Sequence, residues 1–178
     1  RVRGIVITHG HQDHIGGLPY LISELNAPIY ATKLTDGLIR VALKQQRVRS
    51  NVDLHVLPSS GKVRLGCFEV EFFPVCHSIP DAVGLVIRTP LGIIVHSGDF
   101  KIDHTPVDGI PTDMARLAQI GTDGVLLLMA DSTYAEMPGY TPSERVVGEN
   151  LDRVMAQASG RVIVTTFSSL ISRIQQVI

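Results

Sequence analysis

Short runs of β-branched and apolar residues alternate along the chain with longer segments of helical periodicity. This alternation predicts an α/β fold, because a strand buries every second residue and a helix every third or fourth. The predicted strands cover residues 4–8, 28–31, 53–57, 62–65, 68–75, 83–89, 92–96, 125–130 and 161–165. The predicted helices cover residues 13–26, 33 to about 48, a short segment between Thr112 and Gly121, 142–158, and the stretch after Ser168 or Ser169.

Capping signals mark several of these helices. Thr32 and Thr112 are expected to cap the helices that follow them. Thr141 and Glu144 have the spacing of a capping box, and Pro142 stands at the first helical position.

Two strands carry a more specific pattern. Residues 68–72 alternate apolar and acidic side chains, so one face of that strand is expected to be wet. Residues 125–130 are continuously apolar, which predicts a strand covered on both faces. From this strand onward the order of elements resembles a new βαβα unit, so we place a domain boundary near Pro138-Gly139.

Composition narrows the class of protein. Hydrophobic residues make up 44% and charged residues 19%, which is typical of a globular chain. Sixteen Lys and Arg against 17 Asp and Glu give a net charge of −1, so no overall positive field attracts nucleic acid or membranes. Two cysteines favour a reducing, cytoplasmic location, and no apolar run reaches the ~18 residues of a membrane span. The sequence begins almost directly with a predicted strand and ends within a predicted helix, so we expect the chain to be a fragment of a longer protein.

One stretch near the start gathers donors that metal ions prefer. Within six residues it contains His9, His11, Asp13 and His14. Alternation along an extended turn points His9 and His11 the same way, whereas Asp13 and His14 fall on the first helical turn. One metal ion is expected at each pair, and these ligands suit Zn²⁺. The alternatives are a polar loop with chance histidines and a single structural metal. The lack of a nearby cysteine argues against the latter.

Further ligands are expected at the ends of other strands. His77 follows the strand at 68–75, and Asp99 follows the strand at 92–96. His77 would complete three nitrogens on the first metal, and Asp99 could bridge both metals. Taken alone, His77 could be a satisfied core histidine and Asp99 a turn residue.

Together these residues resemble motifs of the metallo-β-lactamase superfamily. The amino-acid sequence around these motifs, at residues 8–17, 77–81, 97–103 and 131–136, resembles the ribonuclease J family of β-CASP nucleases. The resemblance implies a partial αββα sandwich over residues 1–138. It also implies that residues 139–178 begin an inserted, truncated α/β β-CASP domain.

The same resemblance assigns roles. It implies that His9, His11 and His77 bind one zinc, and that Asp13, His14 and the bridging Asp99 bind the other. Asp13 would also orient the nucleophile. Asp131 would be the acidic residue that opens the β-CASP signature, with a catalytic role in positioning a missing histidine that protonates the leaving oxygen; its alternative is a helix cap or turn residue. The family's first-motif Asp would lie before residue 1 and two later histidines beyond residue 178, so the fragment alone is expected to be inactive.

The implied activity is that of a zinc-dependent ribonuclease. It would hydrolyse RNA by a two-metal hydroxide mechanism, as a 5′-3′ exonuclease, an endonuclease or both, and leave a 5′-phosphate. The resemblance also implies two Zn²⁺ per full-length chain, RNA as partner, a homo-oligomer and no membrane. The alternatives are a superfamily hydrolase of small esters or thioesters, and a non-catalytic RNA-binding paralogue.

A basic patch on the second predicted helix is open to two interpretations. It comprises Arg40, Lys44, Arg47 and Arg49. Such a patch is either a solvated helix face or a contact for an RNA backbone.

Overall fold

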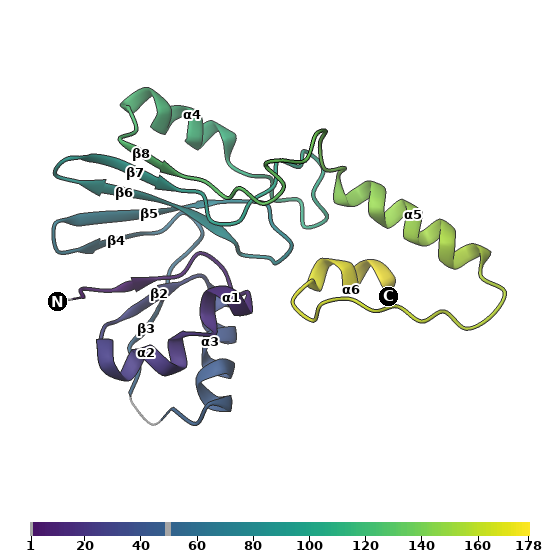
Figure 1. Cartoon of the computed structure of the whole chain (residues 1–178), viewed down its shortest axis with the longest axis horizontal. Coiled ribbons are helices and arrows are strands. Elements are labelled where there is room, and N and C mark those ends of the chain that lie inside the picture. The colour runs from purple at the N-terminus through teal and green to yellow at the C-terminus, as the bar shows by residue number, and fades with distance from the viewer. Residues whose placement is uncertain (1, 49–50) are drawn as a thin grey trace.

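Two β-sheets pack face to face with helices on their outer sides (Figure 1). The computed structural model describes residues 2–48 and 51–178. The first sheet is parallel, with the order β1-β2-β3. Its strands are β1 (Ile5–Val6), β2 (Ile29–Ala31) and β3 (Leu54–Val56), and the neighbouring helices are α1 (Gln12–Ile15), α2 (Leu18–Leu25) and α3 (Lys33–Gln45).

The second sheet has the order β4-β5-β6-β7-β8. Its strands are β4 (Lys62–Leu65), β5 (Phe68–Pro74), β6 (Val83–Thr89), β7 (Gly92–His96) and β8 (Leu127–Met129). Neighbouring strands are antiparallel except β7 and β8, which are parallel. Parallel neighbours need a crossover, and α4 (Met114–Asp123) supplies it.

Three separate apolar clusters hold these layers together. The cluster between the two sheets contains Leu65, Val70, Phe72, Val83 and Leu85. A second cluster joins the first sheet to α2 and α3, and a third joins the second sheet to α4. The expected α/β class is therefore confirmed, with a helix–sheet–sheet–helix layering of one parallel and one mixed sheet.

The prediction that one face of β5 is exposed to solvent is only partly correct. Glu69 is exposed, but Glu71 is buried on the face that α4 covers. Arg116 of α4 donates to both Glu71 carboxylate oxygens at 2.7 and 2.9 Å, and Lys62 lies 3.1 Å away. Burial alone would raise the pKa of Glu71, but these cationic partners hold it below its usual value.

The predicted single helix over residues 13–26 is wrong. Gly16 and Gly17 separate α1 from α2, and the second helix starts with Pro19 in its first turn. The next helix, α3, ends at Gln45, and the hydroxyl of its N-cap residue Thr32 does not cap it. Asp81 does so from a distant loop, where its carboxylate accepts the N–H of Leu34 at 3.1 Å.

Later helix boundaries also differ from the prediction. Asp113, not Thr112, caps α4, and this helix continues past Gly121. Ser143, not Thr141, caps α5 (Glu144–Gln157). The last helix, α6 (Ile171–Val177), begins after Leu170 rather than at a serine.

The two strands predicted in the C-terminal part of the chain differ most from the structure. Residues 161–165 carry no strand, and within the described chain no neighbour pairs with them. The predicted strand at 125–130 shortens to β8, whose side chains are exposed instead of covered on both faces. β8 is the last strand of its sheet, so it pairs along one edge only.

The two C-terminal helices lie apart from the sheets. Figure 1 places α5 and α6 beyond the right end of the two sheets. Across residues 2–48 and 51–178, none of the helices combines the length and apolar character needed to cross a membrane.

Candidate metal centre

Four strand ends converge on one edge of the sandwich. β5, β7 and β8 run in the same direction, so the residues after them, His77, Asp99 and Asp131, meet at one edge. β1 of the other sheet is joined to this edge because Val83 donates its N–H to the carbonyl of Thr8 at 3.0 Å.

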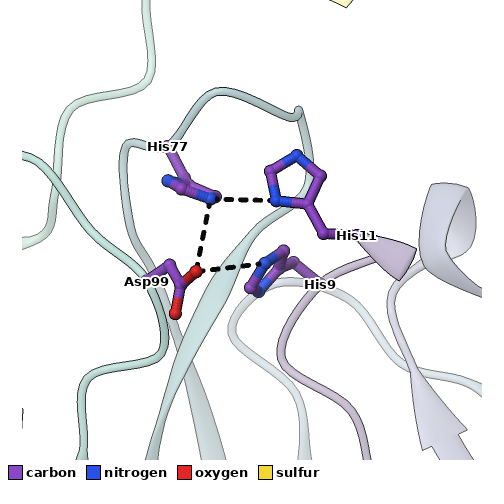
Figure 2. A group of neighbouring side chains, drawn as sticks. All are labelled: His9, His11, His77 and Asp99. Carbon is purple, nitrogen blue, oxygen red and sulfur yellow. Dashed lines mark hydrogen bonds and ion pairs between the residues drawn. The ribbon is translucent and has the colours of Figure 1, made fainter. Parts of the chain in front are cut away.

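His9, His11, His77 and Asp99 form the first group of donors (Figure 2). One ligand atom from each lies within 4.8 Å of the others. His77 Nε2 lies 3.2 Å from His11 Nδ1 and 3.7 Å from Asp99 Oδ2. His9 Nε2 is also 3.7 Å from Asp99 Oδ2. The four side chains thus turn their donor atoms toward one point.

Asp13, His14 and Asp99 form a second group beside the first. His14 Nε2 lies 3.5 Å from Asp13 Oδ2 and 3.4 Å from Asp99 Oδ2. Oδ2 of Asp99 therefore faces both groups. The structure brings together all six residues singled out in the sequence.

His9 supplies the observation that most favours a metal ion. The residue is 0% exposed, and its Nδ1 lies 3.1 Å from the hydroxyl of Thr8. Its Nε2 is buried and has no hydrogen-bond partner among the described residues. Leaving a buried polar atom unpaired costs about 1–3 kcal/mol, and a metal ion at this point would satisfy it.

The imidazoles of the first group are held neutral. Burial, followed by the neighbouring His14, His77 and His11, lowers the pKa of His9 to about 3. Burial also lowers the pKa of His11 and of His77. A neutral imidazole offers the lone pair that a metal ion needs, so this donor set is suited to binding a metal.

Gly98 allows Asp99 to reach the cluster. Its φ is +60°, and a Cβ there would lie 2.8 Å from the carbonyl oxygen of Val83 and 3.3 Å from Cβ of Thr8. Only glycine fits this left-handed turn between the two strand ends.

A protein-family model for the beta-lactamase superfamily domain matches residues 1–160. The chain belongs to this superfamily. The expected resemblance to ribonuclease J is also confirmed. The chain is 50% identical to ribonuclease J of Thermus thermophilus over its whole length and 48% identical to that of Synechocystis over 98% of its length.

The chain spans about a third of the length of these relatives, 32% and 28% respectively. Among solved structures, a protein of unknown function from Enterococcus faecalis superposes with a TM-score of 0.72. That match covers 99% of this chain and 44% of the other at 21% identity, so it shows the superfamily fold alone.

Asp131 lies beside the two groups without belonging to either. Its N–H donates to the hydroxyl of Ser97 at 2.9 Å, and its carboxylate accepts the N–H and hydroxyl of Thr133 at 2.9 and 2.7 Å. Burial opposes ionisation, but the hydrogen bonds that the carboxylate accepts from Thr133 and Phe100 keep the pKa of Asp131 below its usual value.

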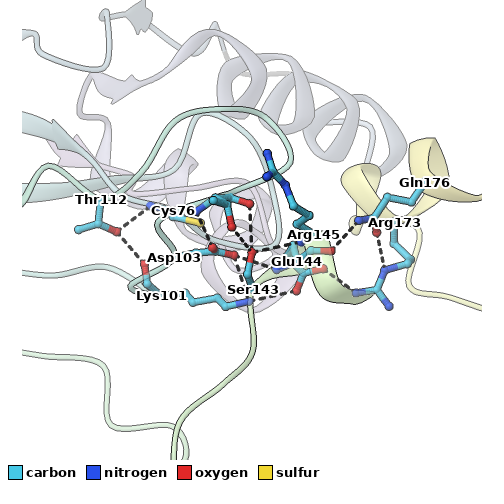
Figure 3. Close-up of polar contacts among 10 residues, drawn as sticks. Cys76, Lys101, Asp103, Thr112, Ser143, Glu144, Arg145, Arg173 and Gln176 are labelled. Atoms are coloured by element: carbon cyan, nitrogen blue, oxygen red, sulfur yellow. Dashed lines mark hydrogen bonds and ion pairs between the residues drawn. The ribbon is translucent and has the colours of Figure 1, made fainter. Parts of the chain in front are cut away.

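A polar network missed by the sequence reasoning links the metal-site loops to the C-terminal helices (Figure 3). The Asp103 carboxylate accepts the N–H of Glu144 at 2.9 Å, and Lys101 lies 3.3 Å from the Glu144 carboxylate. Lys101 is tied to the strand end before His77, because it donates its N–H to the carbonyl of Cys76. Nothing in the sequence signals that Asp103 and Glu144 meet, since they lie far apart along the chain.

The basic patch stays open to both interpretations. Arg40 is paired with Asp36 one turn earlier, at 2.8 Å, whereas Lys44 and Arg47 are exposed. Arg49 lies outside the described residues.

Proposed function

We propose that this chain carries the metal centre of a metal-dependent ribonuclease of the ribonuclease J type. The whole protein would hydrolyse RNA phosphodiesters, as a 5′-3′ exonuclease, an endonuclease or both, and leave a 5′-phosphate. The observation that carries the proposal is the position of Asp99 Oδ2 between the two donor groups. The identity to two ribonuclease J proteins supports the choice of substrate.

Two Zn²⁺ ions are the proposed occupants. His9, His11, His77 and Asp99 would hold one ion, and Asp13, His14 and Asp99 the other. Three imidazoles with a carboxylate match the ligands that zinc prefers. Bound at such a site, zinc supplies a nucleophile from water at neutral pH and neutralises charge that develops on the phosphate.

The chain's own side chains would prepare this chemistry. Thr8 fixes the ring of His9, so that Nε2 faces the centre. The Asp13 side chain is 78% exposed, so the carboxylate is open to solvent and could orient an attacking water. Asp131, already ionised and close to His77, would position a proton donor for the leaving oxygen.

Residues 1–138 would form the superfamily core and residues 139–178 the beginning of a β-CASP domain. The exposed side chains of β8 support further packing in the whole protein. We also propose a homo-oligomer. Light scattering of the full-length protein tests this.

The test uses the full-length protein and RNA carrying a 5′-monophosphate. Cleavage is expected, with products bearing a 5′-phosphate, and His11→Ala should reduce the rate by at least about 10²-fold because it removes a ligand. His55→Ala is the matched control, since this exposed histidine on β3 pairs with Asp53 away from the centre.

Three outcomes would contradict the proposal. Unchanged cleavage by His11→Ala would remove the metal centre from the reaction. Hydrolysis of esters or thioesters without cleavage of RNA would favour the alternative enzyme. RNA binding without cleavage, by a chain holding fewer than two zinc ions, would favour the non-catalytic paralogue.

A further inference from the structure

A cavity of about 450 Å³ opens beside the metal centre. Its lining residues are His11, Gln12, Asp13, Ser78, Phe167, Ser169 and Leu170. One wall thus comes from the donor cluster and its neighbours, and the other from the segment that precedes α6. The volume falls within the roughly 300–1,000 Å³ of typical ligand pockets.

Phe167 is the distinctive residue of the second wall. It is 82% exposed, although it lines a cavity whose opposite wall holds proposed ligands. An exposed aromatic ring at a binding site offers a face on which a planar group can stack. In proteins that bind single-stranded nucleic acid, such rings stack on bases regardless of sequence.

The segment that carries Phe167 is fixed to the loop that carries Asp99. Leu170 donates its N–H to the carbonyl of Phe167 at 3.0 Å and is the N-cap residue of α6. Arg173 of α6 donates to the Glu144 carboxylate at 2.7 Å, as Figure 3 shows, and Glu144 is bound in turn to Asp103.

A second bond strengthens this connection. Gln176 donates from Nε2 to the carbonyl of Glu144 at 2.9 Å. Phe167 and the donor cluster are therefore connected by hydrogen bonds through a few intervening residues. These bonds hold the backbone of Phe167 near the donor cluster, so little of the segment has to be ordered when a ligand binds.

We propose that Phe167 is a substrate-binding residue that stacks on the nucleobase next to the scissile phosphate. This inference rests on the proposed ribonuclease function and names a second point of substrate contact. The metal centre would hold the phosphate, and Phe167 would hold the adjoining base across the cavity. With a net charge of −1, the chain lacks the overall positive field that could hold RNA by itself, so stacking supplies affinity that charge does not.

The experiment compares full-length variants on two single-stranded RNA substrates. One substrate is intact, and the other has an abasic ribose next to the cleaved bond, so that only the base is missing. Phe167→Ala is expected to lower kcat/KM on intact RNA by about 5- to 150-fold, the equivalent of one lost stacking contact. Most of the loss should fall on KM, because the base is stacked in both the ground state and the transition state.

Conservative variants separate stacking from packing. Phe167→Tyr should retain the wild-type value, whereas Phe167→Leu, which keeps apolar bulk without an aromatic ring, should resemble Phe167→Ala. Tyr20→Ala is the matched control, because this exposed aromatic residue of α2 does not line the cavity. The abasic substrate should cost the wild type as much as Phe167→Ala does and cost that variant nothing further.

Two results would overturn the inference in distinguishable ways. If the wild type cleaves RNA but the abasic penalty persists undiminished in Phe167→Ala, stacking is refuted and the ribonuclease function stands. If the wild type cleaves no RNA, the proposed function and the stacking contact fail together.

Discussion

Asp99 Oδ2 lies 3.4 Å from His14 Nε2, although the two residues follow strands of different sheets. The same oxygen lies 3.7 Å from Nε2 of His9 and of His77. One carboxylate therefore links both donor groups, and the sandwich must form before either group is complete.

Asp99→Asn is expected to weaken metal binding at both donor groups. An amide keeps the shape of the side chain but removes the negative charge that would be shared by two cations. We expect the zinc content of the full-length protein to fall from two ions per chain to one or none. Mass spectrometry of dialysed protein measures it. Asp53→Asn, which changes an exposed aspartate beside His55, should leave it unchanged, and equal zinc in the two variants would contradict the shared role.

The metal-free protein is expected to lose stability as the pH falls below about 6.5. The pKa of His9 is about 3 in the folded state, whereas a histidine in an unfolded chain keeps its ordinary pKa of 6.5. Between these values the unfolded state binds a proton that the folded state rejects, so acid favours unfolding. This one group contributes a slope of at most about 1.4 kcal/mol per pH unit.

Urea denaturation of the metal-free protein at pH 7, 6, 5 and 4 measures this slope. His9→Gln removes the titrating ring and should flatten the profile. A profile that His9→Gln leaves equally steep would contradict the burial of a neutral imidazole at this position.

Asp103→Asn is expected to loosen the C-terminal helices. The Asp103 carboxylate accepts the N–H groups of Glu144 and Thr105, each at 2.9 Å, and these bonds help to lower its pKa to about 2. Hydrogen bonds to a charged group contribute about 1.5–3 kcal/mol, so a loss of this size is expected in urea denaturation. Because the folded-state pKa is depressed, this stabilisation is present above pH 3.8 and disappears as the pH falls toward 2.

Asp108→Asn provides the control for this variant. Asp108 lies in the same loop region, and its carboxylate accepts the local N–H of Ile110 at 3.0 Å. Hydrogen exchange should show faster opening of α5 and α6 in Asp103→Asn alone. Equal exchange in both variants would show that the network does not hold these helices.

Gly98→Ala is expected to reduce both stability and metal binding. A Cβ would lie 2.8 Å from the carbonyl oxygen of Val83, so the turn that carries Asp99 would have to shift. Gly109→Ala is a matched control, because Gly109 also has a positive φ, +74°, but no atom of residues 2–48 and 51–178 beyond its chain neighbours lies within 4 Å of its Cβ position. The control should lose only the ~1–2 kcal/mol of left-handed strain. Equal losses of zinc in both variants would show that the close approach is unimportant.

The local pattern of apolar and polar residues was sufficient to predict most strands of the second sheet. β4, β6 and β7 have the predicted bounds, because alternating side chains and a tight turn define antiparallel strands within a short stretch of sequence. The six donor residues could be predicted to meet because each follows a strand or begins a helix, and strand ends converge at one edge.

Features that depend on distant partners could not be predicted in this way. Glu71 is buried because Arg116 of α4 covers it, and α3 is capped by Asp81 from another loop. The contact between Asp103 and Glu144 has no local signal either. In each case the hydrogen-bond or ion-pair partner lies far away in the sequence, and the periodicity of apolar residues cannot predict such a contact.

The most direct test of the dinuclear centre is anomalous X-ray diffraction at the zinc edge from crystals of the zinc-loaded full-length protein. We predict two peaks, one on either side of the Asp99 carboxylate, the first next to His77 and the second next to His14. A single peak, or peaks remote from Asp99, would contradict the dinuclear centre.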